Sequence, residues 1–566
     1  MKQFQLQSAA WLAAGLMATA CVQARPGHAR PNVLFIAVDD LKPLLGCYGD
    51  KTIKSPNIDR LSARGVLFER AYCNQAVCAP SRNALMTGLR PQTLGIYDLG
   101  TNFRNAVPDA VTLPQSFMKA GYRTEAIGKI MHVGQGNHED AASWSVPHVH
   151  PSGGYASQAA IAERRKQMRE ARDRGVAAKD IGTQVKGPAT ESAAVPDNAY
   201  GDGKIADEAI KRLQAAKAKP GQPFFLALGF YKPHLPFSAP KKYWDLYNPA
   251  VFRLAQPQTP PQGAPAFAPQ YGGELRQYAG IPKRGPLPDA LQRHLIHGYH
   301  AAASYADAQV GRVLDALDAT GLSKNTIIVL WGDHGWHLGD HGMWCKHTNY
   351  EQAARIPLIV AAPGLKRGIR TSSLVETVDL YPTLCELAGV APPAAQKLEG
   401  ISLVPILKDP RARTRESIIH VYPRGEVLGR AIRTARHRLV EWKKPGAPAD
   451  TAAFELYDYQ TDPLETRNLA AEQPQVLAQL RAILAQHPEA KPQISAPEAN
   501  AKAASDRAAM FARRDKDGNG QLTREEFLAR QPDPDEAPKR FVAFDTNRDG
   551  LISKEEFITM GGQTKP

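Results

Sequence analysis

Two apolar runs that end in carboxylates constrain the fold of this chain most strongly. "PNVLFIAVDD" at residues 31–40 and "NTIIVLWGDHG" at residues 325–335 are short, rich in β-branched residues and closed abruptly by polar residues. Such runs are typical of parallel strands buried on both faces, and open α/β sheets bind their ligands at the carboxyl ends of these strands. The residues at the two ends are Asp39, Asp40, Asp333 and His334. Because both ends carry metal-compatible side chains, the sequence predicts one shared site at this edge of a sheet.

The remaining pattern predicts an α/β fold with a mostly parallel sheet flanked by helices. "QPFFLALGFYKPHLPF" at residues 222–237 predicts a third buried strand that ends in Lys232 and His234. Residues 202–218 and 288–319 have helical periodicity, so strands and helices alternate along the chain. The 566 residues, 43% of them hydrophobic, can bury a large core and suggest two to four structural units.

Changes in composition mark the predicted units. Residues 154–195 are rich in Ala, Arg, Lys and Gln and predict a surface insertion, whereas the Pro- and Gly-rich residues 255–287 predict a long loop around the site. From about residue 415, short strands and one helix at residues 472–487 predict a smaller α+β subdomain. The predicted boundaries are a signal at 1–24, the main domain at 31–412, the subdomain at 413–488, a linker at 489–505 and a helical tail at 506–562.

The first 24 residues have the features of an export signal. A basic residue is followed by a short apolar run and by small residues that suit cleavage after Ala20 or Ala24. The run is too short for a membrane helix, and Arg25 closes it without a stop-transfer pattern. We therefore expect an exported chain, periplasmic or secreted, with no transmembrane segment; lipid anchoring at Cys21 is the alternative.

Charge and cysteine usage narrow the classes of partner. The net charge of +14 favours anionic partners, but no nucleic-acid-binding motif is present, so we expect no nucleic acid. Without Cys21, an odd number of cysteines remains, so at least one is unpaired or modified in an oxidising compartment. No CxxC pair exists, which argues against a zinc ribbon. The remaining cysteines are Cys47, Cys73, Cys78, Cys345 and Cys385, and we expect all but Cys78 to be structural thiols or disulfide partners.

The tail carries two matches to the twelve-residue EF-hand loop, "DKDGNGQLTREE" at 515–526 and "DTNRDGLISKEE" at 545–556. Gly520 and Gly550 stand at the sharp-turn position. Flanking phenylalanines are expected to pack the helices together, and a dockerin-like interaction module is the alternative. The predicted Ca²⁺ ligands are Asp515, Asp517, Asn519, Gln521, Glu526, Asp545, Asn547, Asp549, Leu551 and Glu556.

The strand-end carboxylates suggest chemistry on an anionic group. Carboxylates hold a hard divalent cation, which polarises an anionic oxygen and brings it to a nucleophile. Lysine and arginine neutralise charge on a transferred group, and histidine can protonate a leaving alkoxide. The candidates for these roles are Arg82, Lys129, His132, His234 and Lys346. The residues alone therefore indicate metal-assisted transfer of an anionic group.

A resemblance makes this more specific. "CAPSR" at residues 78–82, followed by "LMTG", resembles the sulfatase signature in which the cysteine is oxidised to formylglycine. The blocks "VDDLKP", "SPNIDRL", "GKIMHVG", "KPHLPF", "GDHGWHLGDHG" and "LYDYQTDPLETRNLA" extend the likeness to the iduronate-2-sulfatase branch. The resemblance covers residues from about 31 to about 487, and it implies an alkaline-phosphatase/sulfatase-like fold.

The resemblance also implies roles for the candidate residues. Asp39, Asp40, Asp333 and His334 would surround one Ca²⁺, and the formylglycine at Cys78 would complete the shell of ligands. For His334, contact with the nucleophile or the sulfate is the alternative. One hydroxyl of the hydrated aldehyde would attack sulfur and the other would expel the sulfate. Arg82 would hold the formylglycine, His132 would assist its turnover, Lys129 and Lys346 would hold sulfate oxygens, and His234 would protonate the leaving oxygen. Lys129, His234, Lys346 and His347 would contact the substrate, and a formylglycine-generating enzyme would be a maturation partner.

Four positions depart from that branch. His337, Asp340, Met343 and His347 stand where the branch has Ala, Glu, Glu and Tyr. His347 follows Lys346 near the sugar pocket and puts uronate specificity in doubt. The expected substrate is an O-sulfated carbohydrate, such as a uronate 2-O-sulfate in a glycosaminoglycan or other polysaccharide. A phosphonate or phosphate monoester hydrolase of the same superfamily, and a non-catalytic Ca²⁺-dependent glycan-binding protein, are the alternatives.

Overall fold

The structure is a computed structural model that describes residues 30–176, 181–182, 184–494, 508, 510–529, 537–547 and 549–560. The predicted export signal at 1–24 and the lipidation candidate Cys21 lie outside these residues. Within the described part of the chain, no helix combines the length and apolar character needed to cross a membrane.

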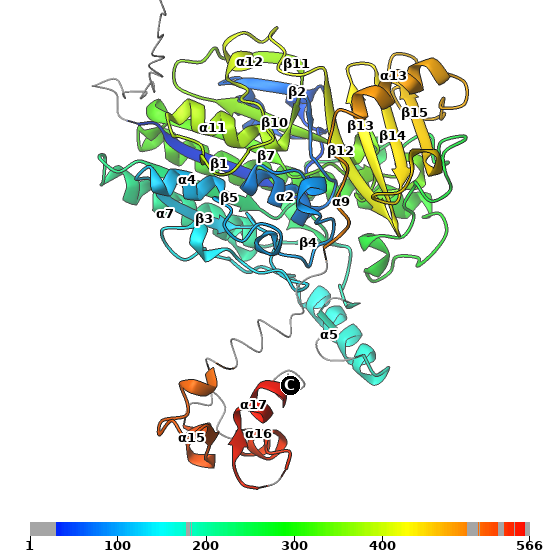
Figure 1. The fold of residues 1–566 in the computed structure, drawn as a ribbon. Helices are drawn as coiled ribbons and strands as arrows, with labels where there is room; N and C mark the ends of the chain where they lie inside the picture. The colour runs from blue at the N-terminus through cyan, green and yellow to red at the C-terminus, as the bar shows by residue number, and fades with distance from the viewer. Residues whose placement is uncertain are drawn as a thin grey trace, which may run out of the picture.

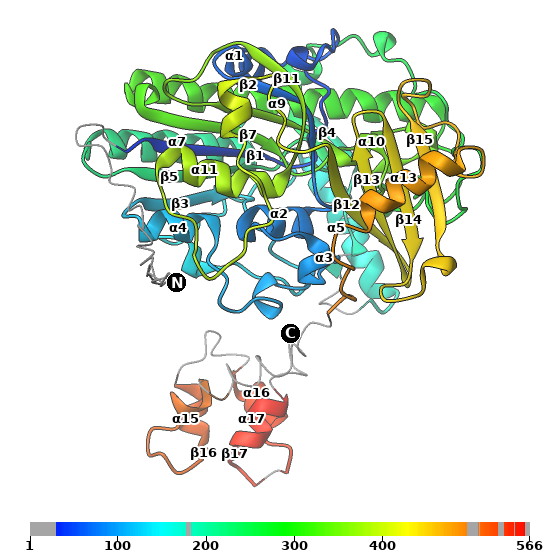
Figure 2. The same ribbon diagram turned by 45° about the horizontal axis from the view of Figure 1, so that its top comes forward.

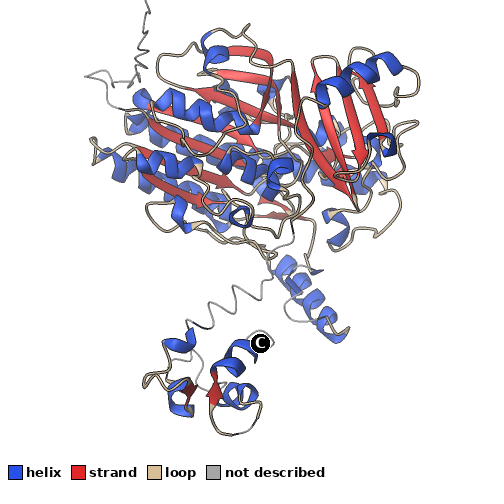
Figure 3. Cartoon of the chain, viewed as in Figure 1, coloured by secondary structure: helices blue, strands red, loops and turns tan. Residues whose placement is uncertain are grey.

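A seven-stranded sheet forms the centre of the main domain (Figures 1 and 3). In spatial order its strands are β11 (Ile369–Glu376), β2 (Val66–Tyr72), β10 (Arg355–Ala361), β7 (Thr326–Gly332), β1 (Asn32–Val38), β5 (Phe224–Phe230) and β3 (Arg123–Gly128). Only β10 runs against its neighbours β7 and β2, and the other pairings are parallel. The predicted mostly parallel sheet is confirmed. The third predicted strand is shorter than its apolar run, because β5 ends at Phe230 and the following prolines take the chain out of the ladder.

Helices cover both faces of this sheet, which explains why its strands are apolar throughout. Alternate residues of β1 point to opposite sides, so Val33 and Phe35 belong to one core and Leu34 and Ile36 to the other. The first core is covered by α2 (Cys78–Thr87), α4 (Leu113–Lys119), α11 (Leu380–Ala388) and α12 (Val404–Lys408). The second is covered by α1 (Pro56–Ser62), α7 (Gly201–Lys217) and α9 (Asp289–Ala319). The two long helices match the predicted segments.

A smaller antiparallel sheet lies beside the large one (Figure 2). Its strands are β12 (Ser417–Arg424), β13 (Val427–Thr434), β14 (His437–Lys443) and β15 (Ala453–Asp458), and α13 (Pro474–Leu484) packs on it. The described start of the predicted linker is attached to the main domain, because the Lys491 and Ile494 amides donate to the carbonyls of Gln92 and Gly95.

Further elements lie outside the two large sheets. They are α3 (Pro91–Leu94), α5 (Gln158–Asp173), β4 (Thr190–Ala193), β6 (Phe237–Pro240), α8 (Lys241–Trp244), β8 (His337–Leu338), β9 (Trp344–Cys345) and α10 (Glu351–Ala354). The predicted insertion at 154–195 contains α5 and β4, whereas the predicted loop at 255–287 contains only one short 3-10 turn, Glu274–Gln277.

The tail has its own small core. Strands β16 (Gln521–Leu522) and β17 (Ile552–Ser553) pair, and α15 (Arg524–Leu528), α16 (Ala537–Phe544) and α17 (Lys554–Met560) flank them. The predicted packing of phenylalanines is confirmed, since all five belong to one buried cluster: Phe511, Phe527, Phe541, Phe544 and Phe557. This pairing of two loops through a short sheet is the arrangement that an EF-hand pair requires.

Candidate active site

The carboxyl ends of β1 and β7 meet at one edge of the large sheet. The two strands pair in parallel with Val38 opposite Gly332, so the residues that follow them lie side by side. The Asp40 amide donates to Asp333 Oδ1 at 3.0 Å. Asp40 has φ of 61°, a left-handed conformation that an aspartate tolerates better than most residues and that turns the chain at the sheet edge. The shared site predicted from the strand ends therefore exists as a cluster of side chains.

Cys78 lies at the first residue of α2, directly against this cluster. Its Sγ is 3.6 Å from Asp39 Oδ1, 3.4 Å from His334 Nε2 and 3.5 Å from Lys129 Nζ. The side chain is buried. The other described cysteines are also buried, and all five are free thiols, so a disulfide role for them is wrong.

Four of the predicted metal ligands form one group of donors. The ligand atoms of Asp39, Asp40, Cys78 and His334 all lie within 4.8 Å of one another. The Cys78 Sγ marks the place that a formylglycine hydroxyl would occupy. Burial raises the pKa of Asp40 to about 6, so a carboxylate here needs a compensating positive charge. Buried carboxylate oxygens beside a further oxygen donor suit a hard cation such as Ca²⁺, so the residues fit the predicted ion.

Asp333 has a different set of contacts. Its Oδ1 accepts from the amides of Asp40 and His334, and its Oδ2 accepts from Arg82 Nε at 3.0 Å. Its role as a fifth metal ligand stays a prediction.

Arg82 is a buried cation that ties the two strand ends together. It forms ion pairs with Asp39 at 3.1 Å and Asp333 at 2.9 Å. Its remaining nitrogen donates to the carbonyls of Lys129 and Ile130. Because the two carboxylates and the two carbonyls use all three nitrogens of the guanidinium, Arg82 holds the carboxylates and the chain after β3 in position.

Two lysines bring further positive charge to the carboxylates. Lys129, directly after β3, contacts Asp39, and Lys346 Nζ lies 2.9 Å from Asp40 Oδ1. Burial opposes the ionisation of Asp39, but Lys129, His234 and Arg82 outweigh it and hold the pKa of Asp39 well below its usual range. Burial alone would lower the pKa of Lys346, but the negative charge of Asp40 outweighs this effect and raises the pKa of Lys346 well above its usual value. Both lysines therefore carry fixed charge at the place where an anion would bind.

Three of the histidines that line the same pocket lie near the lysines: His132, His234 and His347. Burial lowers the pKa of His132 to about 3 and that of His347 to about 3. Neither ring nitrogen of His132, nor Nδ1 of His347, has a hydrogen-bond partner among the described residues, so these atoms are available to a ligand. His234 is fixed differently, because its Nδ1 is 2.6 Å from the Leu235 carbonyl and its Nε2 points toward Asp40 and a glutamate.

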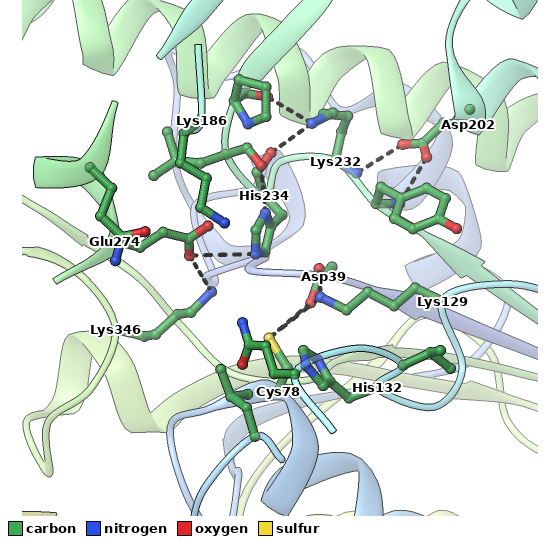
Figure 4. Close-up of a pocket in the computed structure, with 18 of the residues that line it drawn as sticks. Asp39, Cys78, Lys129, His132, Lys186, Asp202, Lys232, His234, Glu274 and Lys346 are labelled. Carbon is green, nitrogen blue, oxygen red and sulfur yellow. Dashed lines mark hydrogen bonds and ion pairs between the residues drawn. The ribbon is translucent and has the colours of Figure 1, made fainter. Parts of the chain in front are cut away.

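That glutamate, Glu274, is a site residue that the sequence reasoning missed. Its Oε2 lies 3.5 Å from His234 Nε2 and 3.4 Å from Lys346 Nζ. Figure 4 shows it facing these two residues, with Lys186 on the same side of the pocket. Glu274 and Lys186 come from the predicted loop and insertion, where no periodic pattern marks a functional position.

Lys232 belongs to the pocket wall. Its ammonium donates to the carbonyls of His234 and Pro236, and its amide donates to Asp202 Oδ2 at 2.9 Å (Figure 4). These bonds hold the loop that presents His234. The whole pocket has a volume of about 700 Å³, with Cys78 and Asp39 in its wall and mostly cationic or polar groups around them.

The two tail loops have the geometry of cation-binding loops. Asp515 Oδ2 accepts from the Gly520 amide at 2.9 Å, and Asp545 Oδ2 accepts from the Gly550 amide at 3.0 Å. Both glycines have φ of 81°, which the sharp turn needs. Ligand atoms of Asp515, Asp517 and Glu526 lie within 4.8 Å of one another. Gln521 and Leu551 stand at position 7, where the ligand is a backbone carbonyl.

Comparisons with known proteins show the family of this chain. The sulfatase family model matches residues 31–390, the model for the N-sulphoglucosamine sulphohydrolase C-terminal region matches residues 339–490, and an EF-hand model matches residues 539–560. Mouse iduronate 2-sulfatase is 35% identical over 512 residues, covering 77% of this chain and 90% of the relative.

Solved structures share the fold at lower identity. A protein in complex with its substrate D-glucosamine-2-N,6-O-disulfate has a TM-score of 0.62 at 22% identity, covering 81% of this chain and 98% of that chain. The phosphonate monoester hydrolase from Silicibacter pomeroyi has a TM-score of 0.63 at 24% identity, covering 81% of this chain and 95% of that chain.

The fold and the site define a hydrolase of the alkaline-phosphatase/sulfatase class. Within that class, the chain belongs to the sulfatase family and is a sulfuric ester hydrolase, and it carries an EF-hand match near its C-terminus.

Proposed function

We propose that this chain hydrolyses O-sulfate esters of an anionic carbohydrate, using Cys78 oxidised to formylglycine and one Ca²⁺ held by Asp39, Asp40, Asp333 and His334. The observation that carries the proposal is the position of Cys78, whose Sγ lies within 3.6 Å of a carboxylate, a histidine and a lysine in the wall of the pocket. An unmodified structural cysteine would not need these polar neighbours.

The modified residue and the ion supply the nucleophile and its activation: a hydrated aldehyde offers one hydroxyl to attack sulfur and a second to expel sulfate, and Ca²⁺ polarises sulfate oxygens. The protein supplies the charge around them. Lys129 and Lys346 remain protonated and neutralise the sulfate oxygens as charge moves onto them. Arg82 holds Asp39 and Asp333 in place.

His234 is placed to protonate the leaving oxygen. Because its Nδ1 faces the Leu235 carbonyl, Nδ1 carries a hydrogen and Nε2 is the atom that exchanges a proton. Burial lowers the pKa of His234 although Asp40 and Glu274 oppose the change. A lower pKa makes the protonated ring a stronger acid, which suits proton donation to an alkoxide.

The substrate class rests on the pocket and on the relatives. The pocket wall includes Lys186, Lys346 and His347, and a relative at 35% identity is an iduronate 2-sulfatase. We propose a sulfated polysaccharide, such as a glycosaminoglycan with a uronate 2-O-sulfate. The N-terminal 24 residues support export to the periplasm or the exterior, and we propose a formylglycine-generating enzyme as the maturation partner.

Mass spectrometry of the peptide spanning residues 71–90, from protein made with the maturation enzyme, tests the mechanism. The expected product carries an aldehyde at Cys78, and Cys78→Ala is expected to lose sulfate release by several orders of magnitude. A thiol at Cys78 in active protein, or undiminished activity of Cys78→Ala, would refute the proposal.

Phosphonate monoester hydrolysis is a second candidate, because such an enzyme shares the fold at a TM-score of 0.63. Parallel assays with aryl sulfate, aryl phosphate and phenylphosphonate esters separate the two. A higher kcat/KM for the phosphonate ester would favour the second candidate. Activity toward none of these esters or toward sulfated oligosaccharides, with retained Ca²⁺-dependent glycan binding, would favour the non-catalytic alternative.

A further inference from the structure

A second group of potential metal ligands lies outside the catalytic cluster, at the rim of the same pocket. It consists of Glu139, His148 and His150, whose ligand atoms all lie within 4.8 Å of one another. His148 Nδ1 is 2.7 Å from Glu139 Oε2, and His150 Nε2 is 3.4 Å from the same oxygen. His150 also lines the pocket that contains Cys78.

The backbone holds the two histidines on one side of an extended segment. Val149 between them forms a bridge to Ile127 of β3, with its amide on the Ala126 carbonyl and its carbonyl on the Gly128 amide. Val149 packs into the core, so His148 and His150 both point away from it, toward Glu139. Their ring centroids are 3.9 Å apart. The ligand positions are therefore set by a strand edge and not by a free loop.

The hydrogen bonds around the group orient its ligand atoms. His148 Nε2 lies 2.8 Å from the Gly128 carbonyl, which only accepts, so Nε2 carries a hydrogen. The Glu139 Oε1 atom accepts from Trp144 Nε1 at 3.1 Å and from the Asp140 amide at 3.2 Å. These bonds leave His148 Nδ1 and Glu139 Oε2 facing each other. Metal-binding histidines and carboxylates commonly have outer partners of this kind.

This arrangement favours a positive charge close to Glu139 Oε2. A neutral His148 would direct the lone pair of Nδ1 at a carboxylate oxygen 2.7 Å away. A proton on Nδ1 would satisfy that pair but would leave out His150, whose Nε2 lies 3.4 Å from the same oxygen. One divalent ion satisfies all three atoms. Donors about 2.1 Å from a tetrahedral ion lie about 3.4 Å apart. This is the separation of His150 Nε2 from Glu139 Oε2, and the 2.7 Å between His148 Nδ1 and Glu139 Oε2 would widen when an ion binds.

The exposure of the group leaves room for further ligands. The His148 side chain is 1% exposed, whereas those of Glu139 and His150 are 21% and 42% exposed. The group thus has a buried side fixed by the protein and an open side toward solvent and the pocket. Two imidazoles and one carboxylate are the donors that Zn²⁺ takes in open sites, whereas Ca²⁺ prefers oxygen alone.

We propose that Glu139, His148 and His150 form a Zn²⁺-class transition-metal site at the pocket rim, separate from the Ca²⁺ positions. The site is connected to the catalytic cluster through β3. His148 forms a hydrogen bond with the Gly128 carbonyl, and the next residue, Lys129, contacts Asp39.

Zn²⁺ titration of the untagged full-length protein tests the site. The protein is kept in saturating Ca²⁺, so that the oxygen-rich sites are filled, and binding is measured by isothermal calorimetry. We expect one Zn²⁺ per chain beyond any bound by the variants. His150→Ala and Glu139→Gln are expected to lose that ion or to bind it at least about tenfold more weakly. Co²⁺ in place of Zn²⁺ is expected to give visible absorption bands that the two variants lack.

The chain offers a matched control in His138, an exposed histidine of the same loop that is outside the group. His138→Ala is expected to bind Zn²⁺ like the wild type. Circular dichroism of His150→Ala, whose side chain is partly exposed, shows whether loss of metal accompanies loss of fold. Equal Zn²⁺ stoichiometry and affinity in the wild type and in folded His150→Ala, or no binding by the wild type at micromolar Zn²⁺, would overturn the proposal.

Discussion

Replacement of Arg82 by methionine tests whether the buried ion cluster stabilises the fold as well as the site. The substitution keeps most of the side-chain volume and removes the guanidinium, which is 1% exposed and pairs with Asp39 at 3.1 Å and Asp333 at 2.9 Å. Breaking a buried pair by removing one partner costs about 3–5 kcal/mol, because the remaining charge stays buried and uncompensated.

The destabilisation differs between the two carboxylates, because they keep different contacts when Arg82 is removed. Asp39 keeps Lys129 as a close cationic partner, whereas Asp333 keeps amide donors from Asp40 and His334 and the more distant His334 ring, whose Nε2 lies 3.7 Å from Asp333 Oδ2. We therefore expect that the uncompensated charge of Asp333 causes most of the destabilisation. The total loss in the free energy of unfolding should lie near the lower end of this range, at about 3 kcal/mol. A Ca²⁺ ion between the carboxylates would add positive charge, so the cost is expected to be smaller in saturating Ca²⁺ than in chelator.

Urea unfolding followed by tryptophan fluorescence measures the difference, with and without Ca²⁺. Arg82→Lys, which keeps the charge and loses the fork of donors, is expected to fall between the wild type and Arg82→Met. Arg411→Met is the control, because Arg411 pairs with Asp409 at 3.2 Å but its side chain is 90% exposed, and no measurable change is expected. Equal unfolding midpoints for Arg82→Met and the wild type in chelator would refute the electrostatic reasoning.

Three further predictions concern other parts of the molecule. Burial raises the pKa of Asp307 from 3.8 to about 6, so the folded state binds the Asp307 proton more tightly than the unfolded state does. The free energy of unfolding therefore falls by up to about 3 kcal/mol as the pH rises from about 4 to above 6. Asp307→Asn should gain stability relative to the wild type over this range, and urea unfolding at both pH values measures the difference. Glu556→Gln removes the position-12 ligand of the second tail loop and should weaken one Ca²⁺ site about tenfold or more in calorimetry. Glu274→Gln removes a negative charge 3.4 Å from Lys346 and 3.5 Å from His234, so KM for a uronate-containing sulfated oligosaccharide should fall, while KM for an aryl sulfate with no charge besides its sulfate changes less.

Each of these has a contradicting outcome. A pH-independent difference between Asp307→Asn and the wild type would show that Asp307 titrates normally. Unchanged Ca²⁺ stoichiometry and affinity in Glu556→Gln, with the exposed neighbour Glu555→Gln as the control, would contradict the loop assignment. An equal change in KM for the uronate-containing substrate and the aryl sulfate would show that Glu274 acts on the cluster and not on the sugar.

The sheet, the edge at which the site lies and much of the chemistry of the site could be predicted from the sequence alone. Buried parallel strands must be apolar along their whole length, so the polar residues that close them stand out. Asp39, Asp40, Asp333 and His334 could be assigned to one edge for this reason alone. The tail loops were equally clear, since Ca²⁺ ligands at fixed spacing within twelve residues form a purely local pattern.

The distant groups that complete the site could not be predicted in this way, because their positions depend on how the chain folds. Glu274 and Lys186 come from segments with no periodicity, and they reach the pocket because long loops fold over the sheet edge. Arg82 and Lys232 show the converse, since their charges were visible in the sequence but their partners were not. The group of Glu139, His148 and His150 likewise depends on a single bridge between Val149 and β3. Local sequence patterns report periodicity and burial, whereas the distance between two charges depends on how the whole chain packs.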